Sequence, residues 1–361
     1  MVKLDQNSTL YNKILGCLIG GALGDAIGGA SEMMLYEKIE QQFGWIDRPL
    51  PTGMTPDTAR FSRGLPAACF TDDTRLKHLL CEAIIRKQGR VTADDLAEIW
   101  LEKMKGWYYT PVLNAFHKIF SGTARPREAG HGCMASNSTA MSFSPIGIIN
   151  ACNPAQAAQD AYDLASMIHE GDARDGAVAI SAAVAEAFKP DASVHSIIDI
   201  STRYLYPKGR MKSLILKAVT LAQECGEYRA FRNAFYQQML IPAPQGVGIE
   251  PPREGFYDTA VPLEAVPAAF ALFYLAEGKW RKTVEYCANF GRDADTLATM
   301  SGAIAGAFEG VSGIPEEWII MIPAANPEAP DQFELAAQMG SAVLQNLQSI
   351  KEQCALIETQ R

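Results

Sequence analysis

Residues 289–310 read NFGRDADTLATMSGAIAGAFEG, and this stretch decides the fold of the chain. Its second half is a run of small residues in which glycine recurs every four positions, at Gly302, Gly306 and Gly310. That spacing places the glycines on one face of a helix. Glycine inside a helix costs about 1 kcal/mol relative to alanine. We therefore expect this helix to be buried and central, with neighbouring helices packed close against its glycine face.

The polar start of the same stretch carries Asp293, Asp295 and Thr296 within one helical turn. A single aspartate at a helix start is usually a cap, which is the simpler interpretation. Two carboxylates and a hydroxyl exceed what capping requires, and a second such cluster, Thr71-Asp72-Asp73-Thr74, also precedes a helical run. Carboxylate and hydroxyl oxygens are the ligands that Mg²⁺ and Mn²⁺ prefer. We favour one shared metal site over two independent caps.

Residues 11–29, YNKILGCLIGGALGDAIGG, form a second stretch with a four-residue glycine repeat, at Gly16, Gly20 and Gly24. We expect a second helix there that packs against the first through close backbone contact. The glycines also suggest a dinucleotide-binding loop. That alternative is weak because no strand pattern precedes them.

The apolar pattern is helical from end to end, and no alternation with a period of two persists. The sequence therefore predicts an all-α fold, with residues 1–361 as one compact domain. The two acidic clusters are about 220 positions apart, and a shared site requires one compact domain. We expect helices at residues 93–105, 194–206, 211–225, 228–240, 265–277, 280–289 and 332–359. We expect irregular connections at residues 40–64, 121–144 and 241–262.

Composition limits the class of protein. The chain has 361 residues, 48% hydrophobic and 20% charged, and a formal net charge of −9. An acidic chain without a basic block is a poor candidate for binding nucleic acid or membrane surfaces. The start of the sequence lacks a signal-peptide pattern, and the eight cysteines show no regular spacing. We expect reduced core thiols in a cytoplasmic protein, and leave the oligomeric state open.

Residues 121–144 are polar and small, which suits a ligand-lining loop or a merely solvated one, and composition does not decide between them. A lone histidine is more often structural than functional. His169 is a candidate only because Gly171 and Asp172 accompany it.

Taken together, these residues resemble the ADP-ribosylglycohydrolase family, the group of the dinitrogenase-reductase-activating hydrolase and the ADP-ribosyl-acceptor hydrolases. The resemblance covers nearly the whole chain in the expected order. Its motifs are the glycine helix from Gly16, Thr71-Asp-Asp-Thr, Ser136-Asn-Ser-Thr-Ala-Met with Pro145-Ile-Gly, Val266-Pro-Ala-Ala, and Gly291-Arg-Asp-Ala-Asp-Thr. Any one of these motifs is weak, but the ordered set is specific.

The resemblance implies a single compact orthogonal helical bundle of the ADP-ribosylglycohydrolase type. It also implies an enzyme that holds two divalent cations, Mg²⁺ or Mn²⁺. The implied ligands are Thr71, Asp72, Asp73, Asp293, Asp295 and Thr296, with Asp295 bridging the ions. The implied catalytic residues are Glu32, Asp73 and Asp295. We expect substrate contacts from Asp25, Ser136, Asn137, Ser138, Met141, His169, Gly171 and Arg292. Arg292 could pair with a phosphate or form a salt bridge to a ligand aspartate, and the sequence favours neither.

The implied reaction is hydrolysis of a ribosyl N- or O-glycosidic bond, which releases ADP-ribose from a protein side chain or a small molecule. Two alternatives stay open: a nucleosidase-like hydrolase of a small ribosylated metabolite, and a relative that binds ADP-ribose without catalysis. The chain departs from the family pattern at Arg292, where glycine is common, and at Ser136 and Ser138, where Gly-Asn-Gly is common. These departures lie in the expected substrate pocket.

Overall fold

The computed structural model of the chain describes residues 4–52, 64–240 and 261–360. Within these ranges the regular elements are all helices and no strand occurs, which confirms the all-α prediction. In chain order the elements are α1 (Thr9–Gly28), α2 (Tyr36–Phe43), α4 (Asp72–Lys87), α5 (Ala93–Lys103), α6 (Thr110–Phe120), η1 (Pro126–Glu128), α7 (Ser138–Ser142), α8 (Ser144–Ile149), α9 (Pro154–Ala165), α10 (Asp172–Ala187), α11 (Val194–Arg203), α12 (Arg210–Cys225), α13 (Tyr228–Gln238), α14 (Pro262–Leu275), α15 (Trp280–Phe290), α16 (Ala294–Glu309), η2 (Val311–Gly313), α17 (Glu316–Ile319), α18 (Ile322–Ala325) and α19 (Gln332–Glu358).

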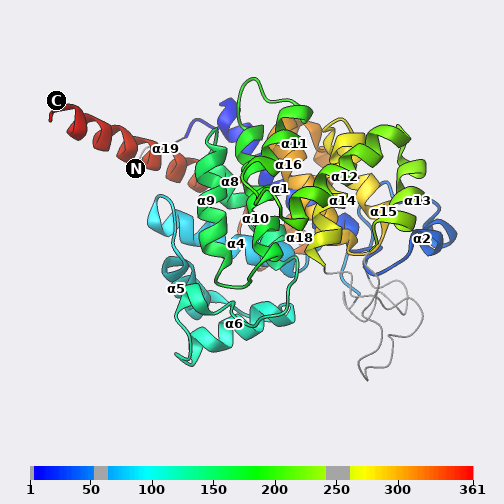
Figure 1. Cartoon of the computed structure of the whole chain (residues 1–361), viewed down its shortest axis with the longest axis horizontal. Helices are drawn as coiled ribbons and strands as arrows, with labels where there is room; N and C mark the ends of the chain where they lie inside the picture. The colour runs from blue at the N-terminus through cyan, green and yellow to red at the C-terminus, as the bar shows by residue number, and fades with distance from the viewer. Residues whose placement is uncertain (1–3, 53–63, 241–260, 361) are drawn as a thin grey trace.

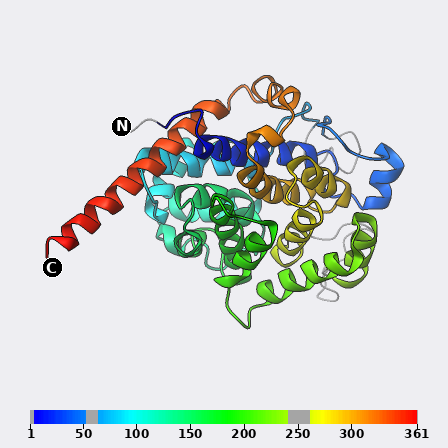
Figure 2. The ribbon, with the colours of Figure 1, turned by 90° about the horizontal axis from the view of Figure 1, so that it is seen from above.

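The two glycine helices, α1 and α16, pack directly against each other at the centre of the molecule (Figure 2). A Cβ added to Gly16 would lie 2.3 Å from the backbone oxygen of Gly306, and one added to Gly306 would lie 2.0 Å from the oxygen of Gly16. Gly20 and Gly302 face each other in the same way, each 2.5 Å from the other's oxygen. Real Cβ atoms do not approach so closely, so glycine is required at these four positions. The predicted contact between the two glycine faces is confirmed.

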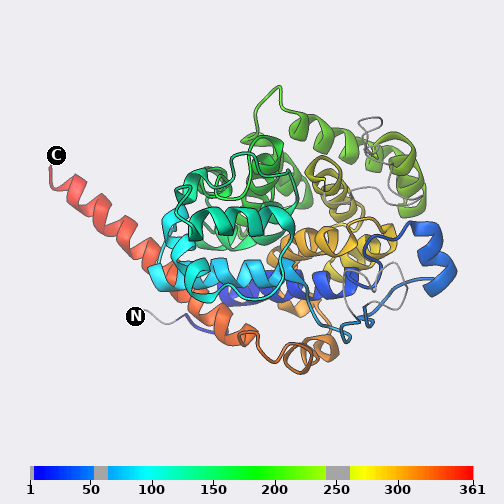
Figure 3. The same ribbon diagram turned by 90° about the horizontal axis from the view of Figure 1, so that it is seen from below.

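The remaining helices surround this central pair (Figures 1 and 3). α14, α15, α10 and α4 pack on α16, while α4, α8, α15 and α19 pack on α1. α9, α7 and α8 in turn pack on α10. The N-terminal ends of α4 and α16 therefore both lie beside α1, and this arrangement positions the acidic clusters.

Local sequence signals set most helix ends where we expected them. Thr92 caps α5 in a capping box, in which its hydroxyl accepts from the backbone N–H of Asp95 and the Asp95 carboxylate accepts from the N–H of Thr92. α11 to α16 and α19 begin and end within a few residues of the predicted ranges. These segments carry the strong helical periodicity that the sequence shows.

Two of the three predicted connections contain several helical residues in the structure. Residues 36–43 form α2, so the segment that we expected to be irregular from residue 40 begins inside a helix. In the segment 121–144, residues 138–142 form the short helix α7 rather than a loop, and α8 begins at its last residue, Ser144. Residues 53–63 of the predicted connection 40–64 lie outside the described part of the chain. The same holds for residues 241–260 of the predicted connection 241–262.

All eight cysteines are free, but only Cys17, Cys81 and Cys287 are buried. Cys152 and Cys354 are exposed. The expectation of core thiols therefore holds for part of the set only. Among the described residues, no helix is both long and apolar enough to cross a membrane.

Candidate active site

The first acidic cluster forms the start of α4. Thr71 is the N-cap, and its hydroxyl accepts from the backbone N–H of Asp73 at 3.3 Å, which leaves Asp72 and Asp73 in the first turn. The Asp25 carboxylate, from α1, accepts from the backbone N–H groups of Thr71 and Thr74 and from the Thr74 hydroxyl, which donates at 2.6 Å. We expected Asp25 to contact substrate. The structure shows it fixing the start of α4, and through it the cluster.

The second acidic cluster forms the start of α16. Asp293 is the N-cap residue, yet its side chain makes no capping hydrogen bond, and the Asn137 amide donates to Asp293 Oδ2 at 2.5 Å. Asp295 lies in the first turn, and its Oδ1 is a buried atom without a hydrogen-bond partner among the described residues. Capping alone therefore does not explain either carboxylate.

The two clusters meet at Asp73. The Thr296 hydroxyl donates to Asp73 Oδ1 at 3.0 Å, and the Thr71 hydroxyl donates to Asp73 Oδ2 at 3.3 Å. The Asp73 carboxylate therefore joins the start of α4 to the start of α16. The two acidic clusters, which are far apart in the sequence, therefore lie together in the fold.

Glu32 reaches the same place from the segment after α1. The backbone N–H of Met33 donates to the oxygen of Arg292 at 2.6 Å, and the N–H of Arg292 donates to the oxygen of Met34 at 2.7 Å. Met33 and Arg292 both have left-handed backbone conformations, with φ of 64° and 62°. This backbone pairing anchors the segment that carries Glu32 to the segment that carries Asp293.

The site concentrates negative charge, contributed by Glu32, Asp72, Asp73, Asp293 and Asp295. Burial is the main cause that raises the pKa of Asp72 to about 6. Burial and the neighbouring carboxylates raise the pKa values of Asp73, Glu32 and Asp295 well above the usual range. Each group therefore resists ionisation in the presence of the others. A bound cation would relieve this repulsion.

Polar side chains from the segment before α7 form a wall beside the acids. Ser136 Oγ lies 2.8 Å from Ser138 Oγ and 3.0 Å from His169 Nε2. Burial lowers the pKa of His169 to about 4, so the imidazole is neutral at neutral pH. Within this wall, the Asn137 amide makes the hydrogen bond to the second cluster, through Asp293.

Met141 and Gly171 have different surroundings. The Thr296 hydroxyl lies 3.9 Å from Met141 Sδ, which places Met141 against the acidic cluster. Gly171 is exposed and precedes α10 with a φ of 57°, and a Cβ added there would meet open space. The structure thus brings Met141 to the carboxylates and places Gly171 at a helix start on the surface.

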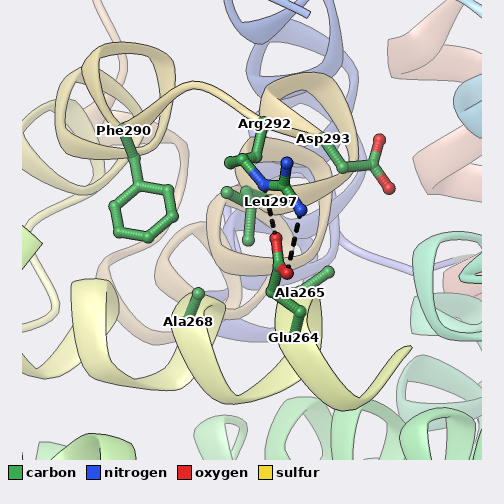
Figure 4. Close-up of a pocket in the computed structure, with 7 residues that line it drawn as sticks. All are labelled: Glu264, Ala265, Ala268, Phe290, Arg292, Asp293 and Leu297. Carbon is green, nitrogen blue, oxygen red and sulfur yellow. Dashed lines mark hydrogen bonds and ion pairs between the residues drawn. The ribbon is translucent and has the colours of Figure 1, made fainter. Parts of the chain in front are cut away.

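Arg292 forms a buried ion pair with Glu264 of α14 (Figure 4). Its Nε and one terminal nitrogen donate to the two carboxylate oxygens at 2.7 and 3.0 Å, and both residues are almost fully buried. These two residues line a small pocket that also includes Asp293 and Leu297. We expected Arg292 to pair with a phosphate or with a ligand aspartate, and its partner is instead a glutamate from another helix.

Two residues near the site, Glu264 and Lys77, were not predicted from the sequence. Glu264 is the lone acidic residue of the apolar helix α14, and that isolation was the available signal. Lys77 of α4 is fully buried, and its Nζ lies 3.4 Å from the backbone oxygen of Leu18. Burial is the main cause that lowers the pKa of Lys77, while the charge of Asp25 opposes this shift. A lysine on a helix is ordinarily exposed, so nothing in the sequence indicated that Lys77 would be buried beside the site.

The donor chemistry of the site fits Mg²⁺ or Mn²⁺, because carboxylate and hydroxyl oxygens predominate. The buried, unpartnered Oδ1 of Asp295 supports the same conclusion. As they are placed, no three His, Cys, Asp or Glu side chains of the described residues converge closely enough to hold an ion. The fit therefore rests on the kind of ligands and on the uncompensated charge.

Comparison with known proteins identifies the family. The ADP-ribosylglycohydrolase family matches residues 6–348. The chain belongs to the ADP-ribosylglycohydrolase family. It is accordingly a glycosidase of the hydrolase class.

Individual relatives cover most of the chain. The uncharacterized protein YegU of Escherichia coli (strain K12) is 31% identical over 315 residues, covering 84% of this chain and 89% of its own. The ADP-ribosylhydrolase ARH3 of Bos taurus is 24% identical over 330 residues, covering 85% and 87%. A solved structure, named as an ADP-ribosylglycohydrolase-related protein complex, superposes with a TM-score of 0.66 at 19% identity, covering 93% of this chain and 99% of its own. This structural likeness supports the fold.

Proposed function

We propose that this chain is a divalent-cation-dependent hydrolase that releases ADP-ribose from a modified protein side chain or small molecule. One observation carries the proposal: five carboxyl groups from three separate segments gather in one space beside a wall of small polar side chains. The name of the relative ARH3, an ADP-ribosylhydrolase, supports the substrate class.

The six oxygen-donor residues of the two clusters would hold the ions. They are Thr71, Asp72, Asp73, Asp293, Asp295 and Thr296. Two divalent ions there would supply Lewis acidity, which makes water more acidic and orients ribose hydroxyls.

The chain's own residues prepare this site in three ways. Asp25 holds α4 in place, and the backbone pairing of Met33 with Arg292 holds Glu32 beside the clusters. Glu32 keeps some exposed surface, and burial and the neighbouring carboxylates raise the pKa of its carboxyl, which suits a group that exchanges a proton with the substrate or water. Asn137 and Ser138 present polar groups at the edge of the acids, where a ribose or phosphate of the substrate would lie.

The nucleosidase-like alternative has one observation in its favour. Arg292 is engaged by Glu264, so this cation is not directed at a substrate diphosphate. A substrate without a diphosphate would not need it.

The deciding experiment compares release of ADP-ribose from serine- and arginine-linked ADP-ribosyl peptides with release of base from nucleosides. Each reaction is run with EDTA, Mg²⁺ or Mn²⁺. We expect metal-dependent release of ADP-ribose, abolished in Asp295→Asn and retained in Asp94→Asn, whose side chain is exposed on α5. Activity that survives EDTA would contradict the metal role. Turnover of nucleosides alone would favour the alternative.

A further inference from the structure

Helix α19 has two halves with different surroundings. Its first half packs on α1, α4 and α8 and buries Ala336 and Met339 completely. Its outer half, residues 344–358, leaves the body of the molecule and projects as a single rod (Figures 1, 2 and 3). Isolated helices of this length are only marginally stable in water. The rod would therefore be stabilised by packing against another surface, which the described residues of this chain do not provide.

An apolar stripe runs along this rod. It consists of Leu347, Ile350, Cys354 and Ile357, spaced alternately by three and four residues, which is the spacing of a coiled-coil seam. Val343, four residues before Leu347, packs against the body of the molecule. Leu347, Ile350 and Ile357 are 45%, 46% and 60% exposed. At 100° per residue, the stripe continues the face that Ala336 and Met339 bury against the body. We call Leu347, Ile350, Cys354 and Ile357 the outer stripe.

We propose that the outer stripe packs against the outer stripe of a second copy of this chain, in an antiparallel pair. An interface around a twofold axis uses the same patch on both partners, and one continuous seam meets that requirement. The proposal is independent of the catalytic reaction.

The orientation follows from the placement of the body. Paired helices lie 8–10 Å apart, roughly, across their seam. At the first half of α19 the seam side is already occupied by α1, α4 and α8 of the same chain. A parallel partner would need its own first half in that occupied space. An antiparallel partner approaches along the outer half of α19 instead, and brings Ile350 of one copy beside Cys354 of the other and Leu347 beside Ile357.

Charge and length favour a second copy over a membrane surface. Residues 344–358 contain only Lys351, Glu352 and Glu358 as charged groups. A helix that lies on an anionic membrane is typically rich in Lys and Arg on its polar face. The rod is about 22 Å long, at 1.5 Å per residue. Specific interfaces bury at least about 1,200 Å² in total, so the pair also needs each helix end to rest near the partner's body, which the antiparallel arrangement provides.

The first test is the mass of the whole protein in solution, by light scattering and sedimentation equilibrium. We expect twice the 39.2 kDa of one chain for the wild type, and a single-chain mass for Leu347→Glu and Ile350→Glu. The matched control is Leu356→Glu, because Leu356 is 66% exposed on the same rod but off the stripe, and this variant should stay dimeric. A monomeric wild type, dimeric stripe variants, or equal dissociation of the control would each overturn the proposal.

The second test is cross-linking, which reads the orientation. In a Cys152→Ser background, which removes the other exposed thiol, Ile350→Cys should form an interchain disulfide with Cys354 under a mild oxidant. Leu356→Cys should add no cross-link. Efficient cross-linking through Cys354 alone, in chains without Ile350→Cys, would show a parallel pair and overturn the antiparallel one. Binding to anionic vesicles that is lost in Ile350→Glu, with no dimer, would also overturn it.

Discussion

Asp295 is the residue that offers the most direct test of the metal hypothesis. Its Oδ1 has no hydrogen-bond partner among the described residues, and burial with the charges of Glu32, Asp73 and Asp293 raises its pKa. Without a cation, this charge destabilises the folded state. When a divalent cation is present, the ionised carboxylate of Asp295 should bind it.

We expect Asp295→Asn to melt at a higher temperature than the wild type in EDTA at pH 8, because the substitution removes a repelled charge. Addition of Mn²⁺ should stabilise the wild type and leave the variant unchanged, since only a ligand that binds the native state raises its stability. Differential scanning fluorimetry measures both effects. A variant that melts lower in EDTA would show that the carboxylate is already compensated.

Arg292 and Glu264 form a pair whose removal should affect stability more than substrate choice. Breaking a buried ion pair by removing one partner costs about 3–5 kcal/mol. Arg292→Gly leaves Glu264 without its guanidinium partner, but relieves a left-handed backbone worth about 1–2 kcal/mol. We therefore expect a net loss of roughly 1–4 kcal/mol in the free energy of unfolding, partly recovered in Arg292→Gly with Glu264→Gln.

Chemical denaturation of the wild type, Arg292→Gly, Glu264→Gln and the double variant measures the interaction energy between Arg292 and Glu264. The exposed pair Arg86 and Glu102, 2.7 Å apart, is the control, and Arg86→Gln should leave the melting temperature unchanged. The ranking of kcat/KM over ADP-ribosyl peptides and nucleosides should be the same in Arg292→Gly as in the wild type. A changed ranking would show that Arg292 takes part in substrate selection.

The sequence predicted the acidic residues of the site but not the partners that hold them. The two oxygen-rich clusters were expected to lie together in one helical domain, and the hydrogen bond from Thr296 to Asp73 shows that they do. The sharing of ions stays a prediction. The capping role of Asp25 and the pairing of Arg292 with Glu264 depend on which helices become neighbours. Spacing along one helix carries no information about a partner on another.

At the scale of elements, the glycine faces of α1 and α16 were predictable because a four-residue repeat has one physical use in a soluble helix, which is close packing. Short helices such as α7 and α8 were not, because Ser, Pro and Gly are equally common in loops and propensity is a weak guide over five or six residues. α2 was missed for the same reason. Long periodic segments were therefore predicted well and short ones poorly.

The close packing of α1 and α16 makes a sharp prediction at Gly306. A methyl group there would lie 2.0 Å from the backbone oxygen of Gly16, and a backbone atom cannot move aside as a side chain can. We expect Gly306→Ala to separate the helices, at a cost of at least about 3 kcal/mol, comparable with the larger core substitutions.

Gly176 of α10 provides the matched control for that substitution. A Cβ added there would lie 3.2 Å from a methyl group of Val266, a side chain that can adjust. Alanine also gains about 1 kcal/mol of helix propensity over glycine. Gly176→Ala should therefore stay within about 1 kcal/mol of the wild type by urea denaturation. Equal losses of stability in Gly306→Ala and Gly176→Ala would show that α1 and α16 do not pack more closely than α10 and its neighbours.

At the scale of the whole molecule, the fold brings opposite ends of the chain into one core. α1 and α16 are separated by most of the sequence, yet pack against each other, and both acidic clusters depend on that contact. The prediction of a single domain over residues 1–361 agrees with this arrangement and stays a prediction.

The charge of the site should also set how the stability of the whole protein depends on pH. Glu32, Asp73 and Asp295 have pKa values raised by burial and mutual repulsion, so the folded state holds protons that the unfolded state has released. Their contribution to stability is complete below the unfolded pKa, near 4, and is lost as pH rises through the folded pKa. The buried His78 and His169, with pKa values of about 3 and about 4, act in the opposite direction, but only below about pH 6.5.

The window from pH 6.5 to 8 therefore isolates the carboxylates from the histidines, and a comparison with Asp295→Asn cancels the remaining groups. In EDTA, the free energy of unfolding of Asp295→Asn should exceed that of the wild type by a margin that grows with pH, by up to about 1.4 kcal/mol per pH unit for one proton. In saturating Mn²⁺ the order should reverse, because the ionised Asp295 then faces a cation. Urea denaturation at four pH values, with and without Mn²⁺, gives both slopes. A margin in EDTA that does not change with pH would show that Asp295 is fully ionised in the folded protein, and the charge that we assign to a metal would then have another partner.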